Sequence, residues 1–269
     1  GNVHKWPSPR VSHQLKYTMP RASRARRRQN GSSGKYYDFI EVGTADHTTI
    51  TQYCANDQSS ASSVGEEIWT NLDDLRWARG LAVDPIREHL DALPDLPQVQ
   101  KVEAAMDEWS GQNQFYFVSP QNIKKHMGKY KALFSDDPWA YRVDVMWYAG
   151  SLGSLGHPHP NLEFMLRGVD RLDLLEKKAV PVYDWGRLCK LFNVRRADVV
   201  QLDCEGKDCA ILRSMLRHYD DDWNLPRVIA FEANHLTPSA EVDATFKSLC
   251  DRGYSVRYRT DKNAMVERQ

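Results

Sequence analysis

The sequence predicts an α/β fold: a mostly parallel, doubly wound sheet with helices on both faces and a closing antiparallel hairpin. Short apolar stretches bounded by Gly, Pro or Asp alternate with stretches of helical periodicity, which is typical of parallel sheets. The last two apolar stretches are too close in the chain for a crossover, so they predict the hairpin. With 269 residues, the chain is long enough for one such domain.

The first half of the sheet is predicted from Tyr36 onward. Residues 36–42 form a short apolar run closed by Gly43, as expected for a buried strand that enters a tight turn. The same reasoning predicts a helix over 47–56, a strand over 79–84, a helix over 86–93, a strand over 98–105 and a strand or hairpin arm over 114–118.

The second half resumes the alternation after an irregular stretch. Residues 120–170 have no clear periodicity, and we interpret them as a lid or substrate insertion because long irregular stretches in compact domains are often functional. Helices are predicted over 184–193, 206–219 and 239–252, and strands over 198–203, 226–232, 254–258 and 262–268.

The N-terminal residues 1–35 differ from the rest of the chain in charge. They hold nine basic residues and no acidic one, although the whole chain has 36 of each sign. Such a segment cannot bury enough apolar surface to fold alone, so residues 1–35 are predicted to be a flexible arm beside a domain over 36–269. The arm is suited to contact RNA or another polyanion; a solvated tail and an organellar targeting remnant are the alternatives.

Composition excludes several classes of protein. Hydrophobic residues make up 41% of the chain, which argues against a mainly disordered protein, and no apolar stretch approaches the roughly 18 residues of a membrane span. The five cysteines contain no C-x-x-C pair. This favours neither a disulfide framework nor a zinc ribbon and predicts an intracellular, reducing compartment.

Acidic residues follow the predicted strands. They are Glu41, Asp84, the pair Asp203 and Glu205, and Glu232. Ligands of doubly wound sheets bind at the carboxyl ends of the strands, and acids gathered there repel one another unless a cation, a donor-rich ligand or raised pKa values relieve them. Taken singly, Gly43 is explained by a turn and Asp84 by a helix cap before Pro85, and no G-x-G-x-x-G motif supports a dinucleotide site.

Together the motifs resemble a family. Glu41-Val-Gly-Thr-Ala-Asp-His-Thr-Thr, Val83-Asp84-Pro85, Leu202-Asp-Cys-Glu-Gly and Phe231-Glu232 resemble, in order, the motifs of FkbM-type S-adenosylmethionine-dependent methyltransferases. The resemblance covers about residues 36–268 and implies a Rossmann-like, class I methyltransferase sheet of seven strands. It departs from the family at His47, where a glycine is common, and at Asp84, where glutamate is common.

The resemblance also implies roles for individual residues. Glu41, Gly43 and Thr44 would border the methionine part of S-adenosylmethionine, Asp84 would bind the ribose, and Glu103 with Ala104 would lie near the adenine. Asp203 and Glu205 would face the methyl-transfer site, with O-methylation of an unidentified acceptor as the implied reaction. For a hydroxyl acceptor His235 is the candidate base, because imidazole titrates near neutrality, and Glu205 is the alternative base.

Three alternatives stay open. Asp203, Glu232 and Asn234 offer oxygen ligands for Mg²⁺ at neighbouring strand ends. His157 and His159 suggest zinc, although two histidines between prolines more often form an ordered surface loop. The third alternative is a catalytically weak or inactive methyltransferase-like subunit of a ribonucleoprotein or other assembly, attached through its basic arm.

Overall fold

The computed structural model describes residues 34–44, 79–93, 95–122, 153–168, 170–260 and 262–268. Nearly all of the predicted arm, the predicted helix over 47–56 with His47, and the middle of the predicted insertion lie outside the described residues. Lys35, predicted to be the last residue of the arm, is the first residue of strand β1 (Lys35–Val42).

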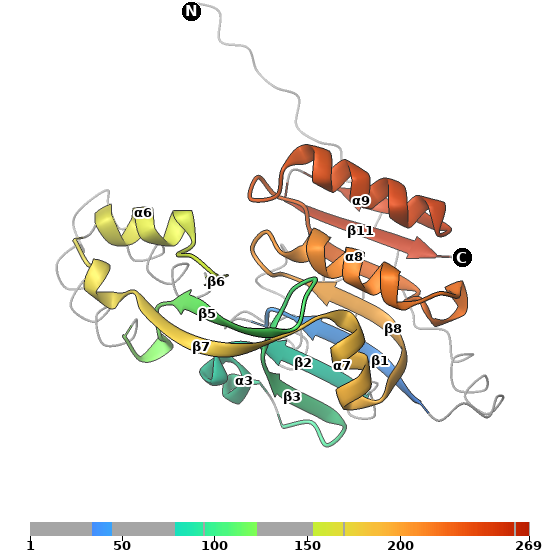
Figure 1. The fold of residues 1–269 in the computed structure, drawn as a ribbon, viewed down its shortest axis with the longest axis horizontal. Coiled ribbons are helices and arrows are strands. Elements are labelled where there is room, and N and C mark those ends of the chain that lie inside the picture. The colour runs from blue at the N-terminus through green and yellow to red at the C-terminus, as the bar shows by residue number, and fades with distance from the viewer. Residues whose placement is uncertain are drawn as a thin grey trace, which may run out of the picture.

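A seven-stranded sheet with the order β10-β11-β9-β8-β1-β2-β3 is the centre of the described structure (Figure 1). Strand β11 runs antiparallel to both of its neighbours, and the four other pairings are parallel. The α/β class, the seven strands and the closing hairpin agree with the prediction. The sheet is mixed where a mostly parallel one was predicted, because β11 inserts between β9 and β10 and adds two antiparallel pairings. The strands are β2 (Gly80–Asp84), β3 (Val99–Glu103), β8 (Val194–Leu202), β9 (Val228–Glu232), β10 (Tyr254–Arg259) and β11 (Asn263–Arg268).

Helices cover both faces of this sheet. Helix α3 (Arg87–Ala92) packs Leu90 and neighbouring apolar side chains against Phe39 and Ala82 on one face. On the other face, a larger core joins the sheet to helices α7 (Trp185–Phe192), α8 (Asp208–His218) and α9 (Ser239–Asp251). Among the described residues, no helix is long and apolar enough to cross a membrane.

A second sheet, of order β4-β7-β5-β6, was not predicted as such. It comprises β4 (Ala105–Met106), β5 (Gly111–Phe117), β6 (Ser154–Leu155) and β7 (Glu176–Tyr183). The strand at β5 was predicted, whereas β7 was missed. Its buried residues Val180 and Val182 are separated by Pro181 and preceded by two lysines, so its alternating pattern is short.

The second sheet connects β3 to α7 and leads away from the main sheet towards helix α6 (Pro160–Gly168), as Figure 1 shows. Leu162 and Leu166 of α6 pack against Val118 and Leu174, the last residue of a short 3₁₀ helix, Leu172–Leu174. A second 3₁₀ turn, Asp222–Asn224, precedes β9. The predicted insertion therefore contains a regular helix close to the site described next.

Candidate functional site

The carboxyl ends of the parallel strands meet at one edge of the main sheet. Val42 of β1 lies opposite Val83 of β2 and Leu202 of β8, so the residues after these three positions are neighbours. From β3 across the sheet to β9, the five parallel strands are the third, second, first, fourth and fifth of that set in chain order. The direction of this order therefore reverses between β1 and β8. Doubly wound sheets bind their ligands at such a switch point.

Gly43 allows the ends of β1 and β8 to approach each other. Its φ is +79°, and a Cβ atom there would lie 1.8 Å from the carbonyl oxygen of Asp203. The Asp203 amide donates to the Val42 carbonyl at 2.9 Å, and the Gly43 amide donates to the Val83 carbonyl at 2.9 Å. The glycine is thus required by the protein's own backbone, whatever ligand binds beside it.

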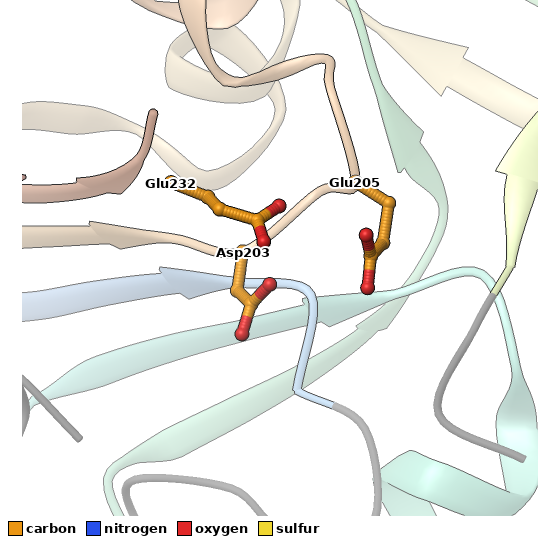
Figure 2. A group of neighbouring side chains, drawn as sticks. All are labelled: Asp203, Glu205 and Glu232. Atoms are coloured by element: carbon orange, nitrogen blue, oxygen red, sulfur yellow. The ribbon is translucent and has the colours of Figure 1, made fainter. Parts of the chain in front are cut away.

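Three of the predicted acids come together at this edge. Asp203, Glu205 and Glu232 each place one carboxylate oxygen within 4.8 Å of the others, and Figure 2 shows the three side chains around one space beyond the end of β1. Among the described residues, no Lys or Arg forms an ion pair with any of them. Within the described ranges, the site therefore concentrates negative charge without a neighbouring cation that pairs with it.

This crowding changes the acidity of the carboxyl groups. Desolvation and then the charge of Glu205 raise the pKa of Asp203 and of Glu232 well above the usual range. Asp203 is an exposed residue, whereas Glu205 and Glu232 are half-buried. A bound cation would relieve the repulsion.

Asp208, the first residue of α8, fixes the backbone around these acids. It is fully buried; its Oδ2 accepts from the Cys204 amide at 3.1 Å and its Oδ1 from the Glu232 amide at 3.0 Å. Desolvation raises its pKa to about 7. Asp208 was not predicted as part of the site; its only signal in the sequence is an acid in the first turn of a predicted helix, where negative charge is favourable.

Glu205 is held in an uncommon backbone conformation. Its φ is +47° and that of the following Gly206 is +89°. A left-handed conformation costs a residue with a Cβ atom about 1–2 kcal/mol. Strain of this kind persists where surrounding contacts hold it, often at functional sites.

His159 was also missed as a member of the site. It is 1% exposed, and its Nε2 lies 3.4 Å from Oε2 of Glu205 without hydrogen-bond alignment. Its Nδ1 accepts from the amides of Asn161 and Leu162 in the first turn of α6, at 3.1 and 3.4 Å. By contrast, His157 is exposed. The two histidines suggested as zinc ligands therefore lie in different environments.

Asp84 is buried and already hydrogen-bonded. Its Oδ2 accepts from the amide and hydroxyl of Thr44 at 2.9 and 3.1 Å, and its Oδ1 accepts from the Ile86 amide at 2.7 Å. His89 lies 3.3 Å from the same Oδ1. These contacts order the chain after β1 and β2, and ribose binding by Asp84 stays a prediction.

The remaining predicted cofactor residues are placed differently from one another. Glu41 is 3% exposed and Ala104 is completely buried. Glu103 is exposed at the end of β3, where its carboxylate lies 3.1 Å from Nζ of Lys178. Of these three residues, only Glu103 has an exposed side chain.

Asn234 and His235, the site residues predicted after β9, are not part of the cluster of Asp203, Glu205 and Glu232. His235 is exposed, and no hydrogen bond or ion pair within the described ranges connects it to Asp203, Glu205 or Glu232. Oδ1 of Asn234 accepts from the Leu236 amide at 2.9 Å and so stabilises the turn after β9. Glu205 takes the place beside Asp203 and Glu232 that Asn234 was predicted to take.

A cavity of about 300 Å³ lies at the opposite edge of the sheet. It is bounded by residues at the amino ends of β1, β2 and β3, away from the acidic cluster. Since ligands of doubly wound sheets bind at the carboxyl ends, this cavity is the weaker candidate for a ligand site. Its lining residues are Lys35, Tyr37, Arg79, Pro97, Gln98 and Gln100.

Comparison with known proteins identifies few similar molecules. No family model and no curated protein sequence matches the chain. One similar solved structure is that of the methyltransferase FkbM from Methylobacillus flagellatus KT, with 10% identity and a TM-score of 0.41. The match covers 90% of this chain and 46% of that chain, so this chain spans less than half the length of that protein. Similarity at this level does not define an activity, and function has to be inferred from the site.

Proposed function

We propose that the chain is an S-adenosylmethionine-dependent methyltransferase that methylates a hydroxyl group of its acceptor. The observation that supports this most is the acidic cluster of Asp203, Glu205 and Glu232 at the switch point between β1 and β8. A switch point favours a nucleoside ligand, and uncompensated carboxylates favour a cationic one. S-adenosylmethionine combines a nucleoside with a sulfonium and an ammonium group.

The same charge argues against phosphate-bearing nucleotides. A pyrophosphate would approach three carboxylates that have no Lys or Arg ion-pair partner among the described residues, and the turn at Gly43 lacks the G-x-G-x-x-G sequence. Lys207, a cation close in sequence, lies 2.9 Å from Asp107 and is neutralised there. The site thus fits a ligand without phosphate better than a dinucleotide.

In this proposal the residues at the ends of β1, β2 and β3 hold the cofactor. Glu41, Gly43 and Thr44 lie on the methionine side, Asp84 on the ribose side, and Glu103 with Ala104 on the adenine side. Asp84 already accepts three hydrogen bonds, and a carboxylate offers about four acceptor positions. The two ribose hydroxyls need two acceptor positions, so binding both requires the Thr44 hydroxyl to release Asp84 or to share it.

The sulfonium supplies an activated methyl group, so the protein has to position the acceptor and accept a proton. The acceptor oxygen forms a bond to the methyl carbon while the carbon–sulfur bond breaks and its electron pair stays on sulfur. The hydroxyl proton passes to a carboxylate and then to solvent. Glu205 is the base best placed for this, with His235 as the second candidate.

Isothermal titration calorimetry of the full chain with S-adenosylmethionine and with S-adenosylhomocysteine tests the cofactor. We expect one ligand per chain, displaced by the other ligand. Asp84→Asn should weaken binding at least about tenfold, because it removes charge-assisted hydrogen bonds of about 1.5–3 kcal/mol each. Gly43→Val is a poor test, since its Cβ would overlap the Asp203 carbonyl.

Glu103→Gln serves as a second variant because Glu103 is exposed and its substitution should not disturb folding. Glu163→Gln, whose carboxylate pairs with Arg167 within α6, is the matched control and should bind like the parent. Absence of binding of either ligand at about 1 mM would refute the proposal. It would leave the inactive, arm-attached subunit as the better hypothesis.

A further inference from the structure

We propose that Asp203, Glu205 and Glu232 form a divalent cation site, with His159 as the residue that orients Glu205. The three carboxylates come from the loop after β8 and from the end of β9, and one oxygen of each lies within 4.8 Å of the others (Figure 2). This spacing allows one ion to contact all three after small side-chain movements. The inference does not depend on methyl transfer.

The second observation that points to a ligand is His159. This residue belongs to the separate second-sheet region, it is 1% exposed, and its Nε2 has no hydrogen-bond partner among the described residues. Nearly all buried polar atoms in native proteins are hydrogen-bonded, so a buried ring nitrogen 3.4 Å from a misaligned carboxylate indicates a missing component.

The contacts of His159 define its role in such a site. Because Nδ1 accepts from the amides of Asn161 and Leu162, the proton of the neutral ring is on Nε2. A protonated Nε2 cannot bind a metal. It can donate to Glu205 when that carboxylate turns to coordinate an ion, so His159 is a positioning residue and not a ligand.

The ligand chemistry selects the ion. Three carboxylates are hard oxygen ligands, which suit Mg²⁺, Mn²⁺ or Ca²⁺ and not a zinc site of histidines. Asp208 holds the amides of Cys204 and Glu232, so the two backbone segments that carry the ligands are fixed relative to each other. Three protein ligands leave coordination positions for water or for an oxygen of a bound acceptor.

Mn²⁺ titration of the chelator-treated full chain, followed by electron paramagnetic resonance, tests the site. We expect one Mn²⁺ per chain, displaced by excess Mg²⁺. Glu232→Gln and Asp203→Asn should each weaken Mn²⁺ binding more than about tenfold, whereas the control Glu163→Gln, at a half-exposed position outside the cluster, should bind like the parent. Circular dichroism checks that each variant is folded.

His159→Gln and His159→Ala separate positioning from structure. His159→Ala should weaken Mn²⁺ binding about tenfold and change the Mn²⁺ spectrum, and His159→Gln, which can still donate to Glu205, should recover part of the affinity. Absence of Mn²⁺ binding, or binding unaffected by Glu232→Gln, would overturn the inference.

The same samples distinguish this inference from the proposed function. Mn²⁺ binding without S-adenosylmethionine binding supports the metal site and removes the methyltransferase proposal. S-adenosylmethionine binding by a chain that does not bind Mn²⁺ supports the methyltransferase proposal and removes the metal site.

Discussion

The two ends of strand β9 adjoin groups of acids in opposite electrostatic situations. Before the amino end of β9, Arg227 bridges Asp198 of β8 and Glu267 of β11, with nitrogen–oxygen distances of 3.1 Å to each. At the carboxyl end, Asp203 and Glu232 meet Glu205 without any Lys or Arg ion pair among the described residues. The two ends of β9 thus adjoin one compensated and one uncompensated group of charges.

The difference separates charges that stabilise the fold from charges that serve a ligand. The charge of a buried carboxylate paired with a guanidinium is neutralised within the protein, and removing one partner strongly destabilises the fold. Carboxylates whose pKa is raised by burial and by one another's charge weaken the fold unless something outside the chain neutralises them. Substitutions at the two ends should therefore change stability in opposite directions.

The largest effect is expected at the compensated end. Arg227→Met should lower the free energy of unfolding by about 3 kcal/mol, because it leaves two largely buried carboxylates with weaker partners. Glu267 keeps Arg257, at 2.9 Å, and this limits the loss. Urea denaturation measures it, with the exposed Arg187→Met as the control; equal stability of the two variants would remove the contrast between the ends.

Asp184 is intermediate between the compensated and the uncompensated acids, because its carboxylate accepts hydrogen bonds from neutral donors. It accepts from the Ser110 hydroxyl at 2.6 Å and from the Arg187 amide at 2.7 Å, and so it caps α7 and ties it to the second sheet. Burial alone would raise the pKa of Asp184, but these hydrogen bonds outweigh burial and lower it. Asp184→Ala should cost about 1–2 kcal/mol at pH 7.

The pH dependence of that loss follows from the direction of the shift. Because the folded-state pKa lies below the ordinary value of 3.8, the contribution of Asp184 is complete above that value. It disappears as pH falls through the folded-state pKa. Chemical denaturation of parent and Asp184→Ala at several pH values should give a constant difference from pH 7 to about 5 that narrows below about pH 4. A difference that grows in acid would contradict this assignment.

Much of the main sheet and part of the site were predictable from sequence. Apolar runs defined the strands from β1 to β11 in the main sheet, and acids after parallel strands had to meet because carboxyl ends share one edge. Asp203, Glu205 and Glu232 were found for that reason. The strand β7 was not, since Pro181 and two lysines interrupt its apolar pattern, and pairing with β4 and β5 stabilises it instead.

The residues that were missed act through tertiary contacts. His159 lies about 45 residues before Glu205 in the chain, and its inclusion depends on how α6 and the second sheet pack, which local patterns do not encode. Asp208 was hidden because its side chain bonds to backbone amides of two separate segments. Asn234 was chosen for its oxygen, which instead closes a turn.

At the uncompensated end, removing an acid should stabilise the fold. Glu232→Gln, measured at pH 8 in EDTA, should raise the free energy of unfolding by about 1 kcal/mol, or about 2–4 °C in melting temperature, because it relieves repulsion from Asp203 and Glu205. Glu267→Gln at the other end is the matched comparison and should destabilise. If both substitutions change stability in the same direction, charge compensation does not distinguish the two ends.

The smallest effect is expected at Glu205, where backbone strain and charge coincide. Glu205→Gly should raise the free energy of unfolding by about 0.5 kcal/mol, because the relief of a left-handed conformation is partly offset by the greater entropy of glycine in the unfolded chain. It should also weaken Mn²⁺ binding more than tenfold, as expected for a lost ligand. Asn193→Gly is the control, since Asn193 has a similar φ of +56° at the end of α7 and lies outside the acidic cluster. Thermal melts in EDTA together with Mn²⁺ titration measure both quantities. A Glu205→Gly variant that keeps full Mn²⁺ affinity would show that the strained residue serves the backbone alone.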